Sequence, residues 1–226
     1  WLDEQDLGDA QISMRTQHLL DRLREDQLNV AFVAEFSRGK SELINAIFFS
    51  DYGQRILPSS AGRTTMCPTE LLFDPQREPS IQLLPIETRA SDTTTAEYKR
   101  YPDEWKTLAL NTASGEGMQQ AFQEVGQTRK VSKEEAERLG LFQPDSEDDQ
   151  LTVDSEGLVE IPCWRHAIIN FPHPLLKQGL VILDTPGLNA IGTEPELTLN
   201  MLPNAHAILF ILAADTGVTK SDIEVW

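Results

Sequence analysis

Two short motifs in this chain carry the residue types that bind phosphate groups and a divalent cation. The first, at residues 34–41, reads Ala-Glu-Phe-Ser-Arg-Gly-Lys-Ser and lies between an apolar run and a helical pattern. In such a loop, consecutive backbone N–H groups converge on phosphates and the lysine adds a positive charge. The second motif, Asp-Thr-Pro-Gly at residues 184–187, also closes an apolar run. Two such motifs at two strand ends predict a site for phosphoryl transfer.

Each motif supplies a defined role in that site. Lys40 is expected to reach the terminal phosphates, and Ser41 is placed to bind Mg²⁺. Asp184 is expected to hold the same metal, directly or through water. The backbone N–H of Gly187 is expected to face the γ-phosphate, because glycine lets the backbone approach a ligand closely.

The loop departs from the usual G-x-x-x-x-G-K-[ST] pattern at Ala34, which replaces the first glycine. If this position requires a positive φ, alanine costs roughly 1–2 kcal/mol. If the position lies in the β region, the cost is small. The sequence leaves both alternatives open, and the first would weaken nucleotide binding.

The elements that must position the motifs form a mixed, mostly parallel sheet with helices. Apolar runs predict strands, and turn residues between neighbouring runs favour two antiparallel hairpins. The stretch 58–65, rich in Gly, Ser and Pro, predicts a loop. The strands are expected at 30–33, 69–73, 80–86, 165–171, 180–183 and 206–213, with hairpins pairing 69–73 with 80–86 and 165–171 with 180–183, and a helix at 42–48.

The chain is expected to divide into an N-terminal segment and one larger domain. Residues 1–28, with helical spacing over 7–27, predict a helix that packs on the domain or belongs to a neighbouring bundle. Residues 29–226 form the larger domain. Within it, residues 90–157 are polar and predict an inserted, partly flexible lobe with helices near 117–127 and 132–141 and a solvated acidic run at 145–149.

Bulk properties restrict the partners. The formal net charge of −17 over 226 residues argues against a nucleic-acid partner and against a broad polybasic surface. The longest apolar run, 205–214, is too short to span a bilayer. Two cysteines predict reduced thiols and a cytoplasmic setting. The chain starts at Trp1 and stops at Trp226 as a new amphipathic segment begins, which indicates a piece of a longer protein with the last part of the domain missing.

A Thr-Lys-Ser-Asp stretch at residues 219–222 invites comparison with the [NT]-K-x-D motif that reads guanine. It comes several residues after its strand, so a helix cap at Ser221-Asp222 is the better interpretation. The base-reading motif is then expected beyond Trp226.

The chain resembles the P-loop GTPase domain of the dynamin superfamily, and most closely that of bacterial dynamin-like proteins. The resemblance covers residues 29–226, and its motifs are specific when taken together. They are Glu35-Phe36-Ser37-x-Gly39-Lys40-Ser41, Leu43-Ile44-Asn45-Ala46, Leu57-Pro58 leading into Thr65-x-x-Pro68-Thr69, Leu180 through Asn189, and Ala214-Asp215-Thr216-Gly217.

The resemblance implies further roles. Thr65 matches the first-switch threonine, which closes over Mg²⁺ and orients the attacking water, and Ser37 matches the serine that helps hold K⁺ or Na⁺. Leu188 follows Gly187, so no glutamine orients water there. Catalytic roles are thus expected for Ser37, Lys40, Thr65 and Gly187, metal binding for Ser41, Thr65 and Asp184, and nucleotide binding for Glu35, Phe36, Ser37, Arg38, Gly39, Lys40, Ser41, Glu42, Asp184 and Gly187.

Two loop residues keep alternative interpretations. Arg38 either supplies charge to catalysis or is solvated or in contact with phosphate. Phe36 either packs beneath the loop or joins a dimer surface. The resemblance implies GTP hydrolysis, a homodimer across the nucleotide face, and contact with membrane lipid through regions outside this chain. The alternatives are a nucleotide-dependent interaction module with little hydrolysis, and an ATPase on the same core.

Overall fold

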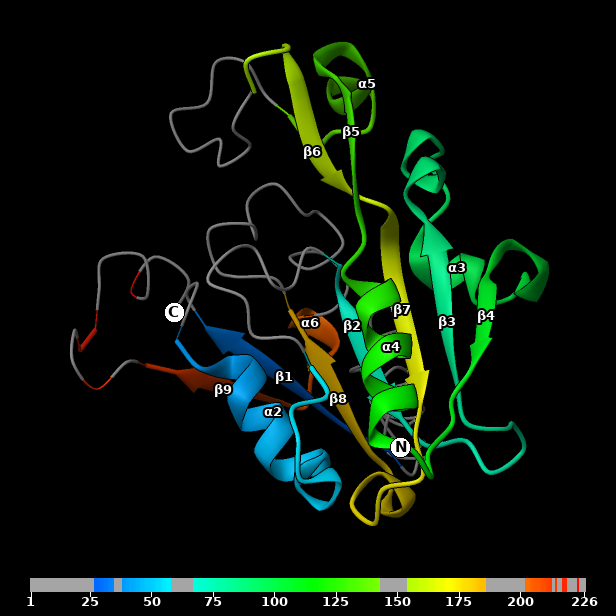
Figure 1. The fold of residues 1–226 in the computed structure, drawn as a ribbon, viewed down its shortest axis with the longest axis vertical. Helices are drawn as coiled ribbons and strands as arrows, with labels where there is room; N and C mark the ends of the chain where they lie inside the picture. The colour runs from blue at the N-terminus through cyan, green and yellow to red at the C-terminus, as the bar shows by residue number, and fades with distance from the viewer. Residues whose placement is uncertain are drawn as a thin grey trace, which may run out of the picture.

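A mixed seven-stranded sheet forms the centre of the molecule, with strand order β4-β3-β7-β2-β8-β1-β9 (Figure 1). The structure is a computed structural model that describes residues 27–34, 38–57, 67–142, 154–185 and 202–212, with residues 214, 217, 218 and 223. The strands of this sheet are β1 (Leu28–Ala34), β2 (Thr69–Leu72), β3 (Ser80–Pro85), β4 (Lys106–Ala109), β7 (Trp164–Asn170), β8 (Leu180–Asp184) and β9 (Ala207–Ile211).

Helices lie on both faces of the sheet, and a separate two-stranded ribbon joins β5 to β6. The helices are α2 (Lys40–Phe48), α3 (Thr95–Tyr98), α4 (Gly115–Val125), α5 (Lys133–Arg138) and α6 (Leu202–Asn204), with short 3-10 turns at Ser50–Tyr52, Ile86–Ala90, Pro102–Glu104 and Leu176–Gln178. The ribbon strands are β5 (Thr128–Ser132) and β6 (Leu158–Pro162). The predicted α/β fold with a mixed sheet is confirmed.

Strand direction changes across the sheet. β1 pairs in parallel with both β8 and β9, and β2 pairs in parallel with β7. The pairs β2–β8, β3–β7 and β3–β4 are antiparallel. The part of the sheet that carries the two phosphate-site motifs is therefore parallel, so the carboxyl ends of β1 and β8 meet at one edge.

Both predicted hairpins are wrong as pairings. β7 lies between β2 and β3, and β2 lies between β7 and β8, so the strands of the two expected hairpins interleave. The physical reason is burial: six of the seven residues of β7 are buried, including Ala167, Ile168 and Ile169 on both faces. Such a strand is stable only with neighbours on each side, and the short turns alone did not indicate this.

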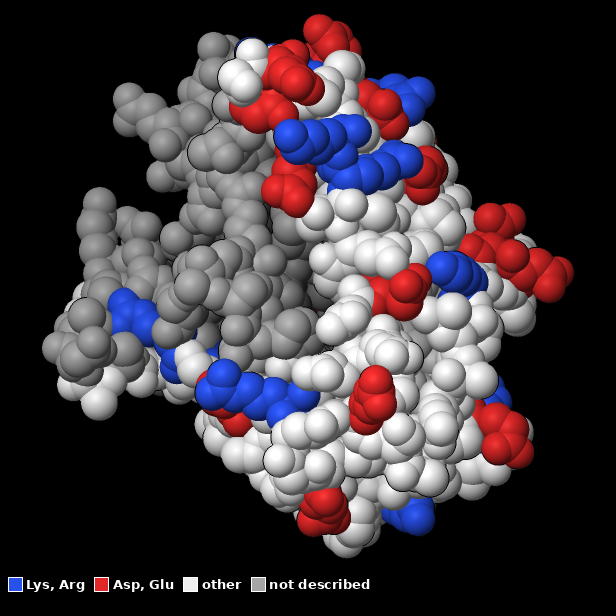
Figure 2. Space-filling view, in the orientation of Figure 1, with Lys and Arg blue, Asp and Glu red and all other residues white. Residues whose placement is uncertain are grey.

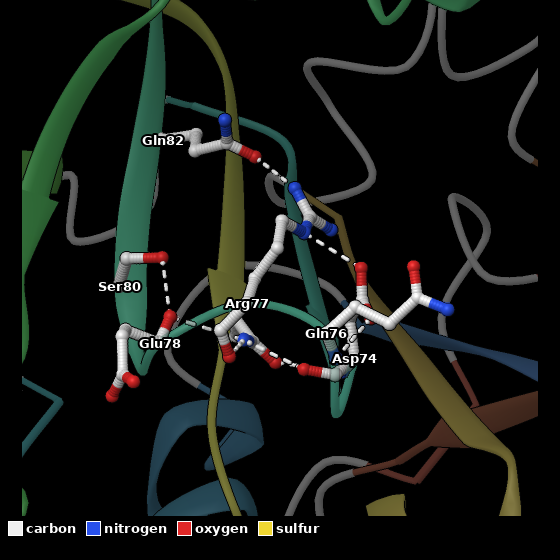
Figure 3. Close-up of polar contacts among 7 residues, drawn as sticks. Asp74, Gln76, Arg77, Glu78, Ser80 and Gln82 are labelled. Atoms are coloured by element: carbon white, nitrogen blue, oxygen red, sulfur yellow. Dashed lines mark hydrogen bonds and ion pairs between the residues drawn. The ribbon is translucent and has the colours of Figure 1, made fainter.

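The turn between β2 and β3 is held by polar contacts that leave room for β7 (Figure 3). Within the turn, Asp74 Oδ2 accepts from Arg77 Nε at 2.7 Å, and Arg77 Nη1 donates to Oε1 of Gln82 on β3 at 2.6 Å. Asn170, at the end of β7, accepts from the Asp74 N–H at 2.7 Å and donates to the Arg77 carbonyl at 2.9 Å. The Asn170 side chain thus holds the backbone of the β2–β3 turn, although β2 and β3 do not pair with each other.

The main core lies between the sheet and the helices α2 and α4, which Figure 1 shows in front of the strands. Ile44 and Phe48 of α2 lie one turn apart on the same buried stripe. Phe49, just after α2, makes an edge-to-face contact with Phe122 of α4 at 5.2 Å between ring centroids. Burial of these rings fixes α2, and with it Lys40 and Ser41 in its first turn, against the sheet.

The segment 90–157 contributes to two different parts of the molecule. β4 pairs with β3, and Met118 and Phe122 of α4 belong to the main core. The ribbon β5–β6 and α5 instead enclose a separate cluster and extend beyond the start of β7 (Figure 1). The predicted helices near 117–127 and 132–141 are confirmed as α4 and α5. This small unit is called the ribbon unit below.

Charges of both signs cover the ribbon unit. Arg129 pairs with Glu87 at 2.8 Å, and Lys130 pairs with Asp154 at 2.7 Å. Figure 2 shows basic and acidic side chains interspersed over the described part of this face. The predicted helix up to residue 26 and the acidic run at 145–149 lie outside the described residues, and the domain boundaries stay predictions.

Candidate nucleotide site

Gly39 begins the helix that follows the phosphate-binding loop. Its φ is 87° and its ψ 13°, a left-handed conformation that an L side chain rarely adopts. Its carbonyl accepts from the Leu43 N–H at 2.9 Å, which starts the helical hydrogen bonding of α2. The glycine therefore lets the chain turn from the loop directly into α2, so that Lys40 and Ser41 stand in the first turn.

Lys40 and Asp184 meet at the carboxyl ends of β1 and β8. Lys40 Nζ lies 2.8 Å from Asp184 Oδ1, and the two side chains are only 9% and 7% exposed. Among the described residues, neither atom has a hydrogen-bond partner beyond this ion pair. A buried ammonium with unused donors and a buried carboxylate with an unused acceptor are costly unless further groups satisfy them.

These two groups fit a phosphate and a metal ion. The ammonium suits phosphate oxygens, and the carboxylate suits Mg²⁺, which prefers oxygen ligands and keeps several waters. No cluster of three or more His, Cys, Asp or Glu side chains that suits a metal occurs in the part of the chain that the structure describes.

The position of Ala34 resolves the question that the sequence left open. Ala34 is the last residue of β1, it is fully buried, and it pairs with Ile211 of β9. A strand residue needs no positive φ, so the penalty for replacing glycine does not apply here. Alanine in place of the first glycine of the loop pattern therefore gives no physical reason for weaker nucleotide binding.

Thr185 joins the end of β8 to β1, a role that sequence reasoning missed. Its Oγ1 donates to the Phe32 carbonyl at 2.9 Å, and the residue is fully buried. On the other side of β8, Asp184 is paired with Thr69 of β2. The backbone at Asp184 is therefore held by neighbouring strands on both sides.

Asn45 is a second residue that sequence reasoning gave no role. From the buried side of α2, its Oδ1 accepts from the backbone N–H groups of Ile56 at 3.0 Å and Leu57 at 2.9 Å. Its Nδ2 donates to the Leu57 carbonyl at 3.0 Å. The side chain thus fixes the backbone just before residues 58–66, where Thr65 stands. A polar residue between the buried positions Ile44 and Phe48 was the available signal.

The other predicted site residues fall into two groups. Ser41 is half-buried in the first turn of α2, Arg38 directly precedes Gly39, and Glu42 forms an exposed ion pair with Arg55 at 3.2 Å. An exposed pair of this kind contributes little to stability. The remaining predicted site residues, Glu35, Phe36, Ser37, Thr65 and Gly187, lie outside the described residues, and their roles stay predictions.

The left-handed glycine before α2, the buried lysine at its first position and the aspartate on the neighbouring parallel strand define a P-loop nucleotide-binding fold. The model of the dynamin family matches residues 30–225. The chain belongs to the dynamin family, which confirms the resemblance.

Curated relatives are longer proteins from bacteria. The chain is 24% identical over 220 residues to the bacterial dynamin-like protein of Nostoc punctiforme, covering 97% of this chain and 24% of that protein. It is 40% identical over 60 residues to the isoniazid-induced protein IniA of Mycobacterium tuberculosis, covering 26% of this chain and 9% of that protein. Dynamin-like protein A of Bacillus subtilis is 21% identical over 222 residues, with 89% and 17% covered. The chain thus spans at most about a quarter of these relatives.

Solved structures of an oligomerised bacterial dynamin pair, described as sensing and tethering membranes, are also similar. One has a TM-score of 0.46 with 15% identity over 98% of this chain and 33% of that chain, and another 0.42 with 19% identity over 89% and 23%. Among the described residues of the present chain, no helix has the length and apolar character needed to cross a membrane.

Proposed function

We propose that this chain binds GTP with Mg²⁺ and hydrolyses its β–γ phosphoanhydride bond. The observation that carries the proposal is the buried pair of Lys40 and Asp184 beside the left-handed Gly39. Membership of the dynamin family supports GTP as the nucleotide.

The residues have separate tasks in this proposal. Lys40 binds the terminal phosphates, and Ser41 and Asp184 hold Mg²⁺, which neutralises phosphate charge when bound. Thr65 orients the attacking water, and the Gly187 N–H contacts the γ-phosphate. Ser37 helps hold K⁺ or Na⁺, which supplies positive charge to the transition state in place of an arginine finger. Leu188 follows Gly187, so no glutamine at that position orients the water.

Dimerisation and membrane contact belong to the whole protein. We expect a homodimer across the nucleotide face that raises turnover, and lipid contact through regions outside this chain, with a cytoplasmic, peripheral location. Family membership supports these expectations. The alternative of a switch with little hydrolysis rested on Ala34, and the position of this residue inside β1 does not favour it.

The test is phosphate release from GTP and ATP by the full-length protein in potassium buffer with Mg²⁺, per molecule and across protein concentrations. We expect turnover with GTP that rises with protein concentration. Binding without release of phosphate from either nucleotide would favour the switch, and release from ATP alone would exclude the proposed specificity.

Two variants separate binding from hydrolysis. Lys40→Ala is expected to abolish nucleotide binding, whereas Thr65→Ala should keep much of the binding and lose turnover, because its interaction matters chiefly in the transition state. Lys106→Ala is the matched control, since Lys106 lies on the edge strand β4 and pairs with Glu124 at 3.3 Å. Equal turnover of wild type and Thr65→Ala would refute the role of that threonine.

A further inference from the structure

A charged cluster joins three separate segments on the face of the sheet opposite α2 and α4. Glu70 on β2 accepts from Lys99 Nζ at 2.7 Å through Oε1 and at 2.8 Å through Oε2. His166 Nε2 on β7 lies 2.9 Å from Glu70 Oε1. Glu70 alternates with Leu71 of the main core, so its side chain points to the other face of the strand.

The cluster is a costly arrangement of charge inside the protein. Glu70 is 8% exposed and His166 only 1%. Burial raises the pKa of Glu70, but the hydrogen bond with His166 and the positive charge of Lys99 outweigh it and lower the pKa to about 2. The carboxylate is therefore ionised at neutral pH and needs donors, so the Nε2 of His166 carries the proton that it donates.

The neighbours of the cluster fix residues 88–105 to β7. Trp105 Nε1 donates to the Tyr98 carbonyl at 2.9 Å, and the Trp105 ring meets the His166 ring edge-on at 6.2 Å. Arg165 lies over the Tyr98 ring at 5.8 Å and donates to the Thr88 carbonyl at 2.9 Å. Lys99, at the end of α3, is therefore presented to Glu70 by a well-packed segment.

Glu70 occupies a position that connects this segment to the nucleotide site. It follows Thr69, which is paired with Asp184, and it comes five positions after Thr65. β2 has only four residues, and the Glu70 side chain adds an anchor to its pairing with β7 and β8. Asn45 fixes the backbone on the other side of residues 58–66. Both flanks of the stretch that contains Thr65 are thus anchored by buried polar side chains.

We infer that Glu70 is a positioning residue for nucleotide hydrolysis: with Lys99 and His166 it holds the start of β2 beside Asp184, and this fixes one end of the stretch that contains Thr65. The inference rests on the proposed function. A misplacement of about 1 Å far from the chemistry can lower a rate by up to about a hundredfold, so loss of this anchor acts on turnover more than on ground-state binding.

The experiment compares steady-state GTP hydrolysis by full-length wild type with Glu70→Gln, Lys99→Met and Lys99→Arg. The first two variants are expected to lower kcat about tenfold with KM changed less than about twofold. Lys99→Arg keeps the cation, and a guanidinium can bind both carboxylate oxygens of Glu70, so its kcat is expected to stay within about twofold of wild type. Lys106→Met, which removes the ammonium that faces Glu124 on the sheet edge, is the control and should match wild type.

A purely structural role predicts a different result. Glu70→Gln and Lys99→Met would then lower the melting temperature and leave kcat unchanged, and this outcome overturns the inference. Turnover by wild type alone decides the proposed function, whereas the comparison of variants with wild type decides the role of Glu70.

A second readout keeps the two questions separate if wild type shows no turnover. Hydrogen exchange of the amides at residues 67–72 is expected to be at least about fivefold faster in Glu70→Gln and Lys99→Met, with exchange in α4 unchanged. Unchanged exchange at residues 67–72 would refute positioning of β2 by Glu70, whatever the activity.

Discussion

Replacement of Asn45 by alanine tests how the backbone before residues 58–66 is held. Three hydrogen bonds of 2.9–3.0 Å are lost, and the N–H of the fully buried Ile56 is left without its acceptor. A buried donor left unsatisfied costs about 1–3 kcal/mol. The two bonds to the partly buried Leu57 contribute about 0.5–1.5 kcal/mol each, and water replaces part of them.

One term acts in the opposite direction. Alanine has a higher helix propensity than asparagine, and at this position in α2 it adds up to about 0.7 kcal/mol to the free energy of unfolding. The expected net loss in the free energy of unfolding of the domain is therefore about 1–5 kcal/mol for Asn45→Ala. The hydrogen-bond terms outweigh helix propensity because the donor of Ile56 is out of reach of solvent.

The assay is urea unfolding of the full-length protein, read by pulsed hydrogen exchange in peptides that cover α2 and β2. This readout reports the domain of interest, and the change in midpoint multiplied by the measured slope gives the change in free energy. Asn111→Ala is the matched control, because the exposed Asn111 accepts one bond from Ala113 at 3.2 Å and should change stability by less than about 0.5 kcal/mol. A loss below about 1 kcal/mol for Asn45→Ala, or a loss equal to that of the control, would refute the reasoning.

Three further predictions follow from packing, backbone conformation and charge. Ala34→Gly should leave GTP affinity within about twofold, because Ala34 lies in a strand; a tenfold gain by calorimetry would contradict this placement. Phe122→Ala should destabilise the main core by about 3–5 kcal/mol, whereas Leu139→Ala should destabilise chiefly the ribbon unit. Hydrogen exchange is expected to become faster in β7 for the first variant and in β6 for the second. Equal acceleration in both strands for either variant would refute separate cores. Because the pKa of Glu70 in the folded protein is lowered to about 2, the stabilisation from its carboxylate is present above about pH 4.5 and is lost as the pH falls towards 2. In urea unfolding, the difference in free energy of unfolding between wild type and Glu70→Gln should therefore narrow by about 2 kcal/mol between pH 6 and pH 3. A difference that stays constant over this range would refute the lowered pKa.

The sequence predicted the parts of the site that depend on local pattern. Gly39 and Lys40 were predictable because they form a Gly-Lys-Ser motif between an apolar run and a helical pattern, and the structure gives Gly39 the left-handed conformation that favours glycine. Asp184 was placed beside them because both motifs close apolar runs, and adjacent parallel strands bring their ends together. These inferences needed no knowledge of distant contacts.

The strand order and the buried polar residues were not predictable in the same way. The insertion of β7 between β2 and β3 depends on the burial of β7 and on the hydrogen bonds of Asn170. The partners of Asn170, Asp74 and Arg77, lie more than ninety positions earlier in the chain. Glu70 and His166 look like solvent-facing positions of strands, because period-two alternation assigns polar side chains to water. Here that face is covered by Trp105 and Tyr98, which come from a segment that seemed irregular in sequence.

The interleaved strand order also restricts when the strands of the sheet can pair during synthesis. β2 ends at Leu72 and its parallel partner β7 begins at Trp164, so the 91 residues from 73 to 163 must be synthesised before this pair can form. At about 5–20 residues per second, β2 waits roughly 5–20 s on the ribosome for its neighbour. During that time the unpaired backbone N–H and C=O groups along β2 are open to wrong partners, and closing so long a loop makes folding intrinsically slow. Synthesis speed through residues 73–163 is therefore a determinant of the yield of correctly folded protein.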